Sequence, residues 1–182
     1  VIFEITLNNL LTEGALDEQD FLDRAELLCA LGHTVMISNF KEYFKAVDYI
    51  WNYSQDKIAL TIGIPSLIEI FDEKHYKNLP GGLFEGLGRL FKHGLEIYVY
   101  PMLNESNQVI TTDNLKLHDE KLAPIYGYFK NDQRIIDIET YEVKNLKIFS
   151  HNVLKKIRIN DDSWMQDVPE TVASLIKEKQ LF

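Results

Sequence analysis

Residues 78–102, NLPGGLFEGLGRLFKHGLEIYVYPM, constrain the fold more than any other stretch of the sequence. Pro80 sets φ at a value that suits the first turn of a helix, and apolar residues then recur at helical spacing. Gly94 favours a helix end, and 95–102 is typical of an apolar, aromatic strand that ends at a proline. A helix that runs directly into a strand is half of a βαβ unit, so this stretch predicts an α/β fold.

Four glycines, Gly81, Gly82, Gly86 and Gly88, lie in and around this expected helix. Each interior Gly costs a helix about 1 kcal/mol relative to Ala, so we expect a close approach that a side chain would prevent. Two interpretations stay open. The glycines permit tight packing of the helix on a sheet, or they form a phosphate or nucleotide site at the helix N-terminus.

Composition limits the class of protein. The chain has 182 residues, enough for one domain and a sizeable core, because 46% of its residues are hydrophobic and 12% are aromatic. The net charge of −9 argues against nucleic acid and anionic membranes as partners. Cys29 is the single cysteine and no apolar run is long enough to span a membrane, so we expect a reducing, cytoplasmic compartment. The chain begins at Val1 inside an expected strand, which predicts a longer polypeptide.

Strands and helices alternate along the sequence, which predicts a mostly parallel, three-layer, Rossmann-like sheet with helices on both faces. We expect one domain over 1–182, with a helical segment at 148–182 packed on it, and a loop or exposed hairpin at 104–114. Ligands of such sheets bind at the carboxyl ends of the strands, here 38–39, 63–66 and 101–104. The expected strands are 1–7, 33–39, 57–64, 95–102 and 134–141; the expected helices are 17–32 (capped by Asp17), 39–54, 66–76, 80–94, 115–129, 151–159 and 168–179.

Two places, one at these edges and one on the glycine-rich helix, are secondary candidates for ligand contact. Ser38 and Asn39 follow a buried strand and open a helix, with Lys41 nearby, so they either contact a ligand or simply cap the helix. Arg89 is spaced i,i+4 from Glu85, which predicts an intrahelical ion pair. If the glycine-rich helix lines a site, then Arg89, Gly81 and Gly82 are its candidate ligand contacts.

Familiar catalytic and metal motifs are absent from the sequence, so catalytic residues stay unassigned. None of the five histidines has a metal-ligand spacing; Asp72 and His75 make the nearest pair, and we expect no metal site. There is neither a G-x-S-x-G elbow nor a G-x-x-x-x-G-K-[ST] phosphate loop. Cys29 lies beside Leu28 on the expected apolar face of a helix, which predicts an inert core thiol.

The tail, 148–182, is the most informative segment for function. Ser150 is expected to cap a helix that carries the densest basic cluster of the chain, Lys155, Lys156 and Arg158. A polar loop follows, and Pro169 then opens a last helix. This segment resembles the closing part of nicotinate or nicotinamide mononucleotide adenylyltransferases. The matching residues are Ser150, Val153 through Arg158, Val168, Pro169, Val172, Ile176, Leu181 and Phe182.

The resemblance implies a nucleotidyltransferase, or its C-terminal portion, with a mononucleotide as substrate and with ATP and Mg²⁺. Ser150, Lys155, Lys156 and Arg158 would then contact the ATP phosphates, as a hydroxyl, free N–H groups and cations can. The family's Ser-Ser/Thr-Thr pair is Ser150-His151-Asn152 here, and its glycine-rich turn with a histidine motif is not in these residues. The chain is therefore either the second part of such an enzyme or a relative without catalysis.

A hypothesis of another class is a non-catalytic α/β module that binds a protein partner or forms a homo-oligomer. Aromatic side chains on the surface would form its contact. The candidates are Trp51, Tyr53, Tyr126, Tyr128 and Trp164.

Overall fold

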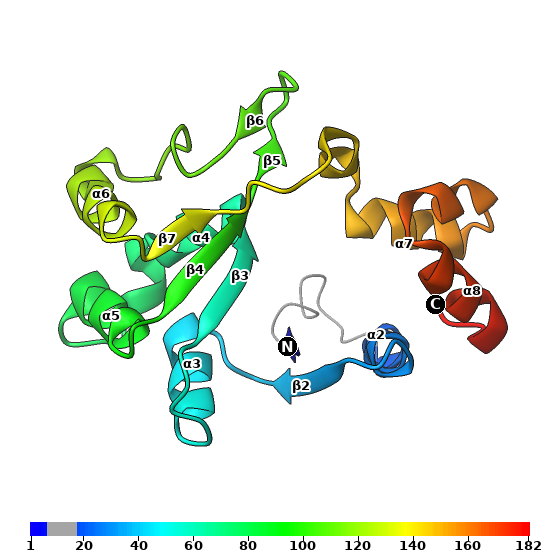
Figure 1. The fold of residues 1–182 in the computed structure, drawn as a ribbon, viewed down its shortest axis with the longest axis horizontal. Helices are drawn as coiled ribbons and strands as arrows, with labels where there is room; N and C mark the ends of the chain where they lie inside the picture. The colour runs from blue at the N-terminus through cyan, green and yellow to red at the C-terminus, as the bar shows by residue number, and fades with distance from the viewer. Residues whose placement is uncertain (7–17) are drawn as a thin grey trace. The chain divides into compact units, whose positions relative to one another are not determined.

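The computed structural model describes residues 1–6 and 18–182, which form two compact units (Figure 1). Unit 1 comprises Val1–Lys41 and Ile148–Phe182, and unit 2 comprises Glu42–Lys147. Unit 2 is therefore continuous in sequence, whereas unit 1 is assembled from two distant segments. The cap predicted at Asp17 lies outside the described residues.

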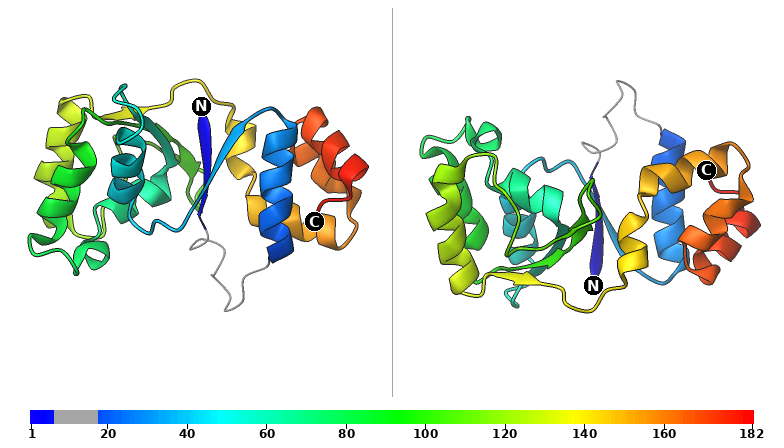
Figure 2. Two further views of the ribbon diagram at one scale, coloured as in Figure 1. Left: turned by 90° about the horizontal axis from the view of Figure 1, so that it is seen from below. Right: turned by 90° about the horizontal axis from the view of Figure 1, so that it is seen from above.

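Unit 1 is built on one pair of parallel strands. β1 (Ile2–Thr6) pairs with β2 (Thr34–Ser38), with Ile2 opposite Thr34 and Thr6 opposite Ser38. Helices from both segments pack beside one another in this unit (Figure 2). They are α2 (Glu18–Ala30), α7 (Ser150–Arg158), the 3₁₀ helix η4 (Asp162–Asp167) and α8 (Glu170–Lys179). Their small apolar core centres on Val153, Trp164, Ala173 and Ile176.

Unit 2 contains a three-stranded parallel sheet in the order β3-β4-β7. β3 is Ala59–Gly63, β4 is Glu96–Tyr100 and β7 is Ile135–Asp137. A short antiparallel hairpin follows β4 and consists of β5 (Met102–Leu103) and β6 (Val109–Ile110). The helices are α3 (Tyr43–Trp51), α4 (Ile64–Ile70), η1 (Glu73–Tyr76), α5 (Gly82–Phe91), η2 (Glu120–Leu122), α6 (Ala123–Asn131) and η3 (Val143–Lys147).

The core of unit 2 forms between this sheet and its helices. Leu60, Ile97 and Ile135 lie side by side across the three strands, and all three side chains join the core. In the middle strand Ile97 and Val99 are completely buried, as is Leu95 just before it. The prediction of an α/β fold with parallel strands is confirmed. The helix and strand predicted within 78–102 are α5 and β4.

Two other predicted helices differ from the observed ones. The helix predicted over 66–76 breaks after Ile70, because the Asp72 carboxylate accepts from the Lys74 N–H and starts a separate 3₁₀ turn. The helix predicted over 115–129 begins only at Ala123, with Pro124 in its first turn. Of the two alternatives for 104–114, a loop or an exposed hairpin, the structure has a hairpin, whose first strand β5 lies just before this stretch.

A tyrosine ring explains one of the glycines in α5. Gly86 is buried, and a Cβ atom at this position would overlap the ring of Tyr76. The Tyr76 hydroxyl donates to the Ile70 carbonyl at 2.8 Å, so the ring is held in place. Gly88 is exposed in the same helix, and a Cβ atom there would have no neighbouring atom within 4 Å outside its own helix backbone. The close approach inferred from the glycines is thus a contact within the core at Gly86.

Arg134 joins the start of β7 to the end of α5. Its Nε donates to the Leu95 carbonyl at 2.7 Å, and its Nη2 donates to the Phe91 carbonyl at 2.6 Å. The guanidinium also lies 5.5 Å from the centre of the Phe91 ring. The bond to Phe91 satisfies a carbonyl group that the end of α5 leaves without a helical partner, and the bond to Leu95 satisfies one just before β4.

We predict opposite effects from two Gly→Ala substitutions in α5. Gly86→Ala should lower the free energy of unfolding by about 1–3 kcal/mol, because the new methyl group displaces Tyr76. Gly88→Ala should raise it by about 1 kcal/mol, because only helix propensity changes. Urea unfolding of the two variants measures both effects. Equal shifts in the two variants would contradict the packing explanation.

Candidate functional site

An apolar cavity in unit 1 is the candidate functional site. Its volume is about 580 Å³. Side chains of β1, α2, α7 and α8 line it, and polar groups are few: Glu4, Thr6, Arg24, Ser150 and Asp167. The apolar wall consists of Ile5, Leu27, Leu28, Ile148, Val153, Leu154, Ile157, Val168, Val172, Ile176 and Phe182.

Ser150 lies at the cavity, but it is not the helix cap that the sequence predicted. The cap position is Phe149, whose carbonyl accepts the N–H groups of Asn152 and Val153, and Ser150 is the first residue of α7. The chain turns into the helix one residue earlier than expected, so no side chain caps this end. Ser150 therefore brings its hydroxyl to the first turn, where the helix dipole favours negative charge.

The three basic residues predicted to contact phosphates together with Ser150 occupy the other end of the same helix. Lys155, Lys156 and Arg158 all lie in the last turn of α7. At a rise of about 1.5 Å per residue, Arg158 is about 12 Å along the axis from Ser150. The Lys156 ammonium pairs with the Asp167 carboxylate at 2.6 Å. The structure thus brings Ser150 to the cavity, whose described lining does not include the basic residues.

Polar contacts fix the strand side of the cavity. The Ser38 hydroxyl is buried and donates to Glu4 Oε1 at 2.5 Å, and its oxygen accepts the Phe40 N–H at 3.3 Å. Thr6, at the end of β1, donates through Oγ1 to the Phe40 carbonyl at 3.2 Å. Ser38 therefore joins the two strands.

The turn after Ser38 also moves the next helix. Asn39 was expected to cap it, but α3 begins at Tyr43 and Glu42 is its cap residue. The cap predicted at Asn39 is therefore wrong, whereas its contact with a ligand stays a prediction. Because the Ser38 hydroxyl bonds the Phe40 N–H, the chain turns at this point before it enters the helix.

Arg24 completes the polar groups on the α2 side. Its Nε donates to Asp20 Oδ2 at 2.8 Å, one turn earlier in α2. The Asp20 side chain is buried, whereas the Arg24 side chain is about one-third exposed. The ion pair therefore holds a guanidinium at the cavity, next to largely apolar walls.

The secondary site predicted on the glycine-rich helix contains a carboxylate of the protein itself. Glu85 Oε2 accepts the Gly81 N–H at 2.8 Å, and Glu85 Oε1 accepts from Arg89 Nη2 at 2.6 Å. The predicted ion pair is confirmed. The Arg89 guanidinium also lies 5.6 Å from the centre of the Phe44 ring. At Gly81, Glu85 takes the position that an anionic ligand would need, and the Gly82 N–H donates to the Leu79 carbonyl at 3.0 Å. These contacts favour the packing interpretation.

Cys29 is exposed, contrary to the prediction of a core thiol. The buried side chains of α2 are Asp20, Phe21 and Asp23, so the buried face lies elsewhere on the helix. Among the residues that the structure describes, no group of three or more His, Cys, Asp and Glu side chains can hold a metal ion. In 1–6 and 18–182 no helix is long and apolar enough to cross a bilayer.

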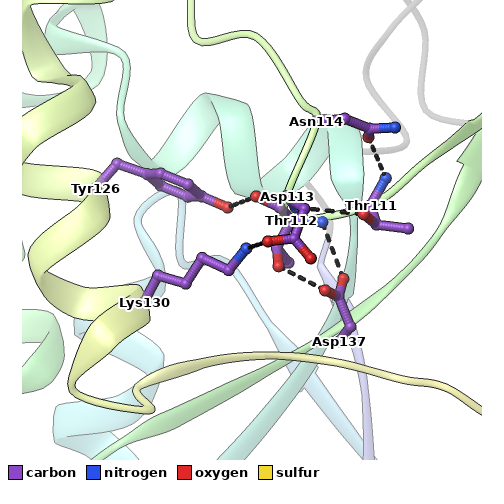
Figure 3. Close-up of polar contacts among 7 residues, drawn as sticks. All are labelled: Thr111, Thr112, Asp113, Asn114, Tyr126, Lys130 and Asp137. Carbon is purple, nitrogen blue, oxygen red and sulfur yellow. Dashed lines mark hydrogen bonds and ion pairs between the residues drawn. The ribbon is translucent and has the colours of Figure 1, made fainter.

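Sequence reasoning missed a polar cluster at the carboxyl end of β7 (Figure 3). Asp137 accepts from the Thr112 N–H at 2.9 Å and from the Thr112 hydroxyl at 2.6 Å. The Tyr126 hydroxyl donates to the Thr112 carbonyl at 2.7 Å, and burial raises the pKa of this phenol. Lys130 pairs with Asp113 beside it. The polar run TTDN (111–114) was the sign of this cluster in the sequence. The partner of Thr112, Asp137, lies 25 residues further on.

The aromatic residues expected on the surface differ in their burial. Tyr126 and Trp164 are buried, so the prediction is wrong for both, because each belongs to an apolar core. Trp51 is half-buried and stacks on His93, with ring centres 4.0 Å apart. Tyr53 and Tyr128 are exposed, at 78% and 64%.

Comparison with known proteins finds no matching family model, curated protein or solved structure.

We predict that Thr112 is a structural tie. Thr112→Val should lower the free energy of unfolding by about 1–3 kcal/mol, because Asp137 loses the hydroxyl donor in a site where Thr112 is 2% exposed. Thr111→Val is the matched control and should cost less, because the Thr111 hydroxyl bonds only an exposed N–H of Asp113. Urea unfolding compares the two variants, and an equal loss would contradict this role.

Proposed function

We propose that unit 1 binds a mononucleotide-class ligand and that the chain is a nucleotidyltransferase-like protein of the mononucleotide adenylyltransferase type, or the C-terminal portion of one. One observation carries the proposal. An apolar cavity meets the first turn of a helix and a serine hydroxyl in the same unit. A ligand that combines a flat ring with a phosphate matches this pairing.

The dimensions and chemistry of the cavity support a ligand of this size. Small-molecule sites usually enclose about 300–1,000 Å³, with apolar walls and a few placed polar groups. Here the apolar wall would take the ring. Ser150 and the N-terminus of α7 would take the phosphate. Thr6 lies at the carboxyl end of β1, the edge at which parallel sheets bind ligands.

The transfer reaction follows from positioning and electrostatics. A mononucleotide phosphate oxygen would attack the α-phosphorus of ATP, forming one P–O bond while the bond to the leaving pyrophosphate breaks. Mg²⁺ would arrive on the ATP phosphates, since ions of this kind bind through substrate phosphates and few protein ligands. Lys155, Lys156 and Arg158 would attract the anionic substrates from the last turn of α7. We also propose that the fold is a three-layer, Rossmann-like one and that the protein is located in the cytoplasm.

We predict that nicotinate mononucleotide, or ATP with Mg²⁺, raises the melting temperature of the protein. A ligand at a hundredfold excess over its Kd stabilises the folded state by about 2.7 kcal/mol. Ser150→Glu should remove this rise in melting temperature, because the glutamate carboxylate would repel the ligand's phosphate from its proposed position. Ser163→Glu is the matched control: it makes the same change in charge at an exposed residue outside the cavity lining. A shift retained in Ser150→Glu would contradict the proposed site.

A second variant tests the basic turn separately. Lys155→Ala combined with Arg158→Ala should weaken ATP binding, and more strongly at low ionic strength than at high. Isothermal titration at two salt concentrations measures this dependence. An unchanged affinity for ATP would remove these two residues from the site while leaving the role of Ser150 standing.

A second candidate function is self-association through unit 2. Tyr53 and Tyr128 are exposed there, and so is Phe84 of α5 at 66%. Tyr128→Ser and Tyr53→Ser should then convert a dimer to a monomer, as measured by light scattering over a range of concentrations. A wild-type chain that stays monomeric at the highest concentration would contradict this candidate.

A further inference from the structure

A buried carboxylate in α2 fixes the chain segment that follows α8. Asp23 is only 3% exposed. Its Oδ1 accepts from Gln19 Nε2 at 2.6 Å, and its Oδ2 accepts the backbone N–H of Phe182 at 2.6 Å. Burying a carboxylate is costly unless donors compensate it. These two donors compensate Asp23, and one of them comes from 159 residues further along the chain.

Other contacts fix the same segment from the side of α8. Gln180 adopts a left-handed conformation at φ 55° and ends the helix. Leu181 is buried, and its N–H donates to the Ile176 carbonyl at 3.1 Å. Lys179 pairs with Glu26 of α2 at 2.7 Å. Phe182 therefore follows a tightly anchored turn, and Asp23 fixes the direction in which the chain leaves it.

Phe182 is part of the cavity wall in unit 1. Phe182 is half-buried. Among the described residues that line the cavity, it is the only one with an aromatic side chain. The neighbouring parts of the wall are aliphatic: Leu27 and Leu28 on α2, and Val172 and Ile176 on α8. Aliphatic side chains bury a ring without selecting its shape, whereas an aromatic ring adds the preferred geometry of stacking.

We propose that Phe182 selects ligands with a flat ring and that Asp23 is the residue that positions it. This inference rests on the proposed function, because it names the part of the ligand that the cavity distinguishes. Phe182 contacts the ring, and Asp23 acts only through the backbone N–H of Phe182. The phosphate end of the ligand lies with Ser150 and does not depend on either residue.

Two probes separate ring recognition from phosphate recognition. Nicotinate mononucleotide carries both a ring and a phosphate, and ribose 5-phosphate carries the sugar phosphate alone. In isothermal titration, Phe182→Leu should bind nicotinate mononucleotide about 10-fold more weakly, as expected for the loss of one stacked ring. Its affinity for ribose 5-phosphate should stay the same. A merely structural role of Phe182 would weaken both probes equally.

The positioning role of Asp23 has its own measurement, which needs no ligand. Asp23→Asn keeps an acceptor for the Phe182 N–H, and Gln19 can rotate its amide to suit, so amide exchange at Phe182 should stay slow. Asp23→Leu removes the acceptor. In that variant, amide exchange at Phe182 should become fast. The affinity for nicotinate mononucleotide divided by the affinity for ribose 5-phosphate should fall to the value found for Phe182→Leu. Binding of nicotinate mononucleotide in Asp23→Asn should remain within about twofold of the wild type, consistent with a retained hydrogen bond.

The outcomes distinguish the two proposals. A wild-type protein that binds neither probe overturns both the proposed function and the ring selection. A wild-type protein that binds nicotinate mononucleotide, with Phe182→Leu unchanged or equally weak for both probes, overturns the ring selection alone. Slow amide exchange at Phe182 in a folded Asp23→Leu variant overturns the positioning role. If Asp23→Leu does not fold, the affinity ratio in Phe182→Leu still decides the ring selection, and fast amide exchange at Phe182 in a folded Asp23→Asn variant overturns the positioning role.

Discussion

The burial of β4 is the constraint on which the rest of unit 2 depends. Leu95, Ile97 and Val99 are completely covered, because β3 and β7 pair with the strand on its two sides and helices cover its core face. Arg134 fixes the junction between α5 and β4 by binding carbonyl groups on both sides of it. The contact of Tyr76 with Gly86 then fixes α5 against the 3₁₀ turn.

Unit 1 obtains its order in a different way. Its buried apolar cluster is small, and a small core stabilises less than a large one. Buried polar groups contribute instead, through the hydrogen bonds of Ser38 with Glu4 and of Asp23 with Phe182. These bonds act at defined points, and apolar space remains between the helices.

Patterns within a few residues could be predicted from the sequence, whereas contacts over long separations could not. The Pro80 start and the apolar spacing predicted α5 and β4, and the i,i+4 spacing predicted the pair of Glu85 with Arg89. The exposure of Cys29 was missed because the buried face of α2 depends on what packs against it. The bond between Asp137 and Thr112 joins residues whose sequence neighbourhoods carry no sign of each other. The hydrogen bond between Asp23 and Phe182 could not be predicted for the same reason, since these residues are 159 positions apart.

The two-part construction of unit 1 has a consequence for its folding during synthesis. Domains generally fold as units as the chain emerges from the ribosome. Unit 2 is continuous, so it can close its core as soon as residues 42–147 are available. Residues 1–41 are made before unit 2, yet α7 and α8, which complete their unit, are made after it. β1 and α2 must therefore wait, with apolar side chains uncovered, until α7 and α8 have been made.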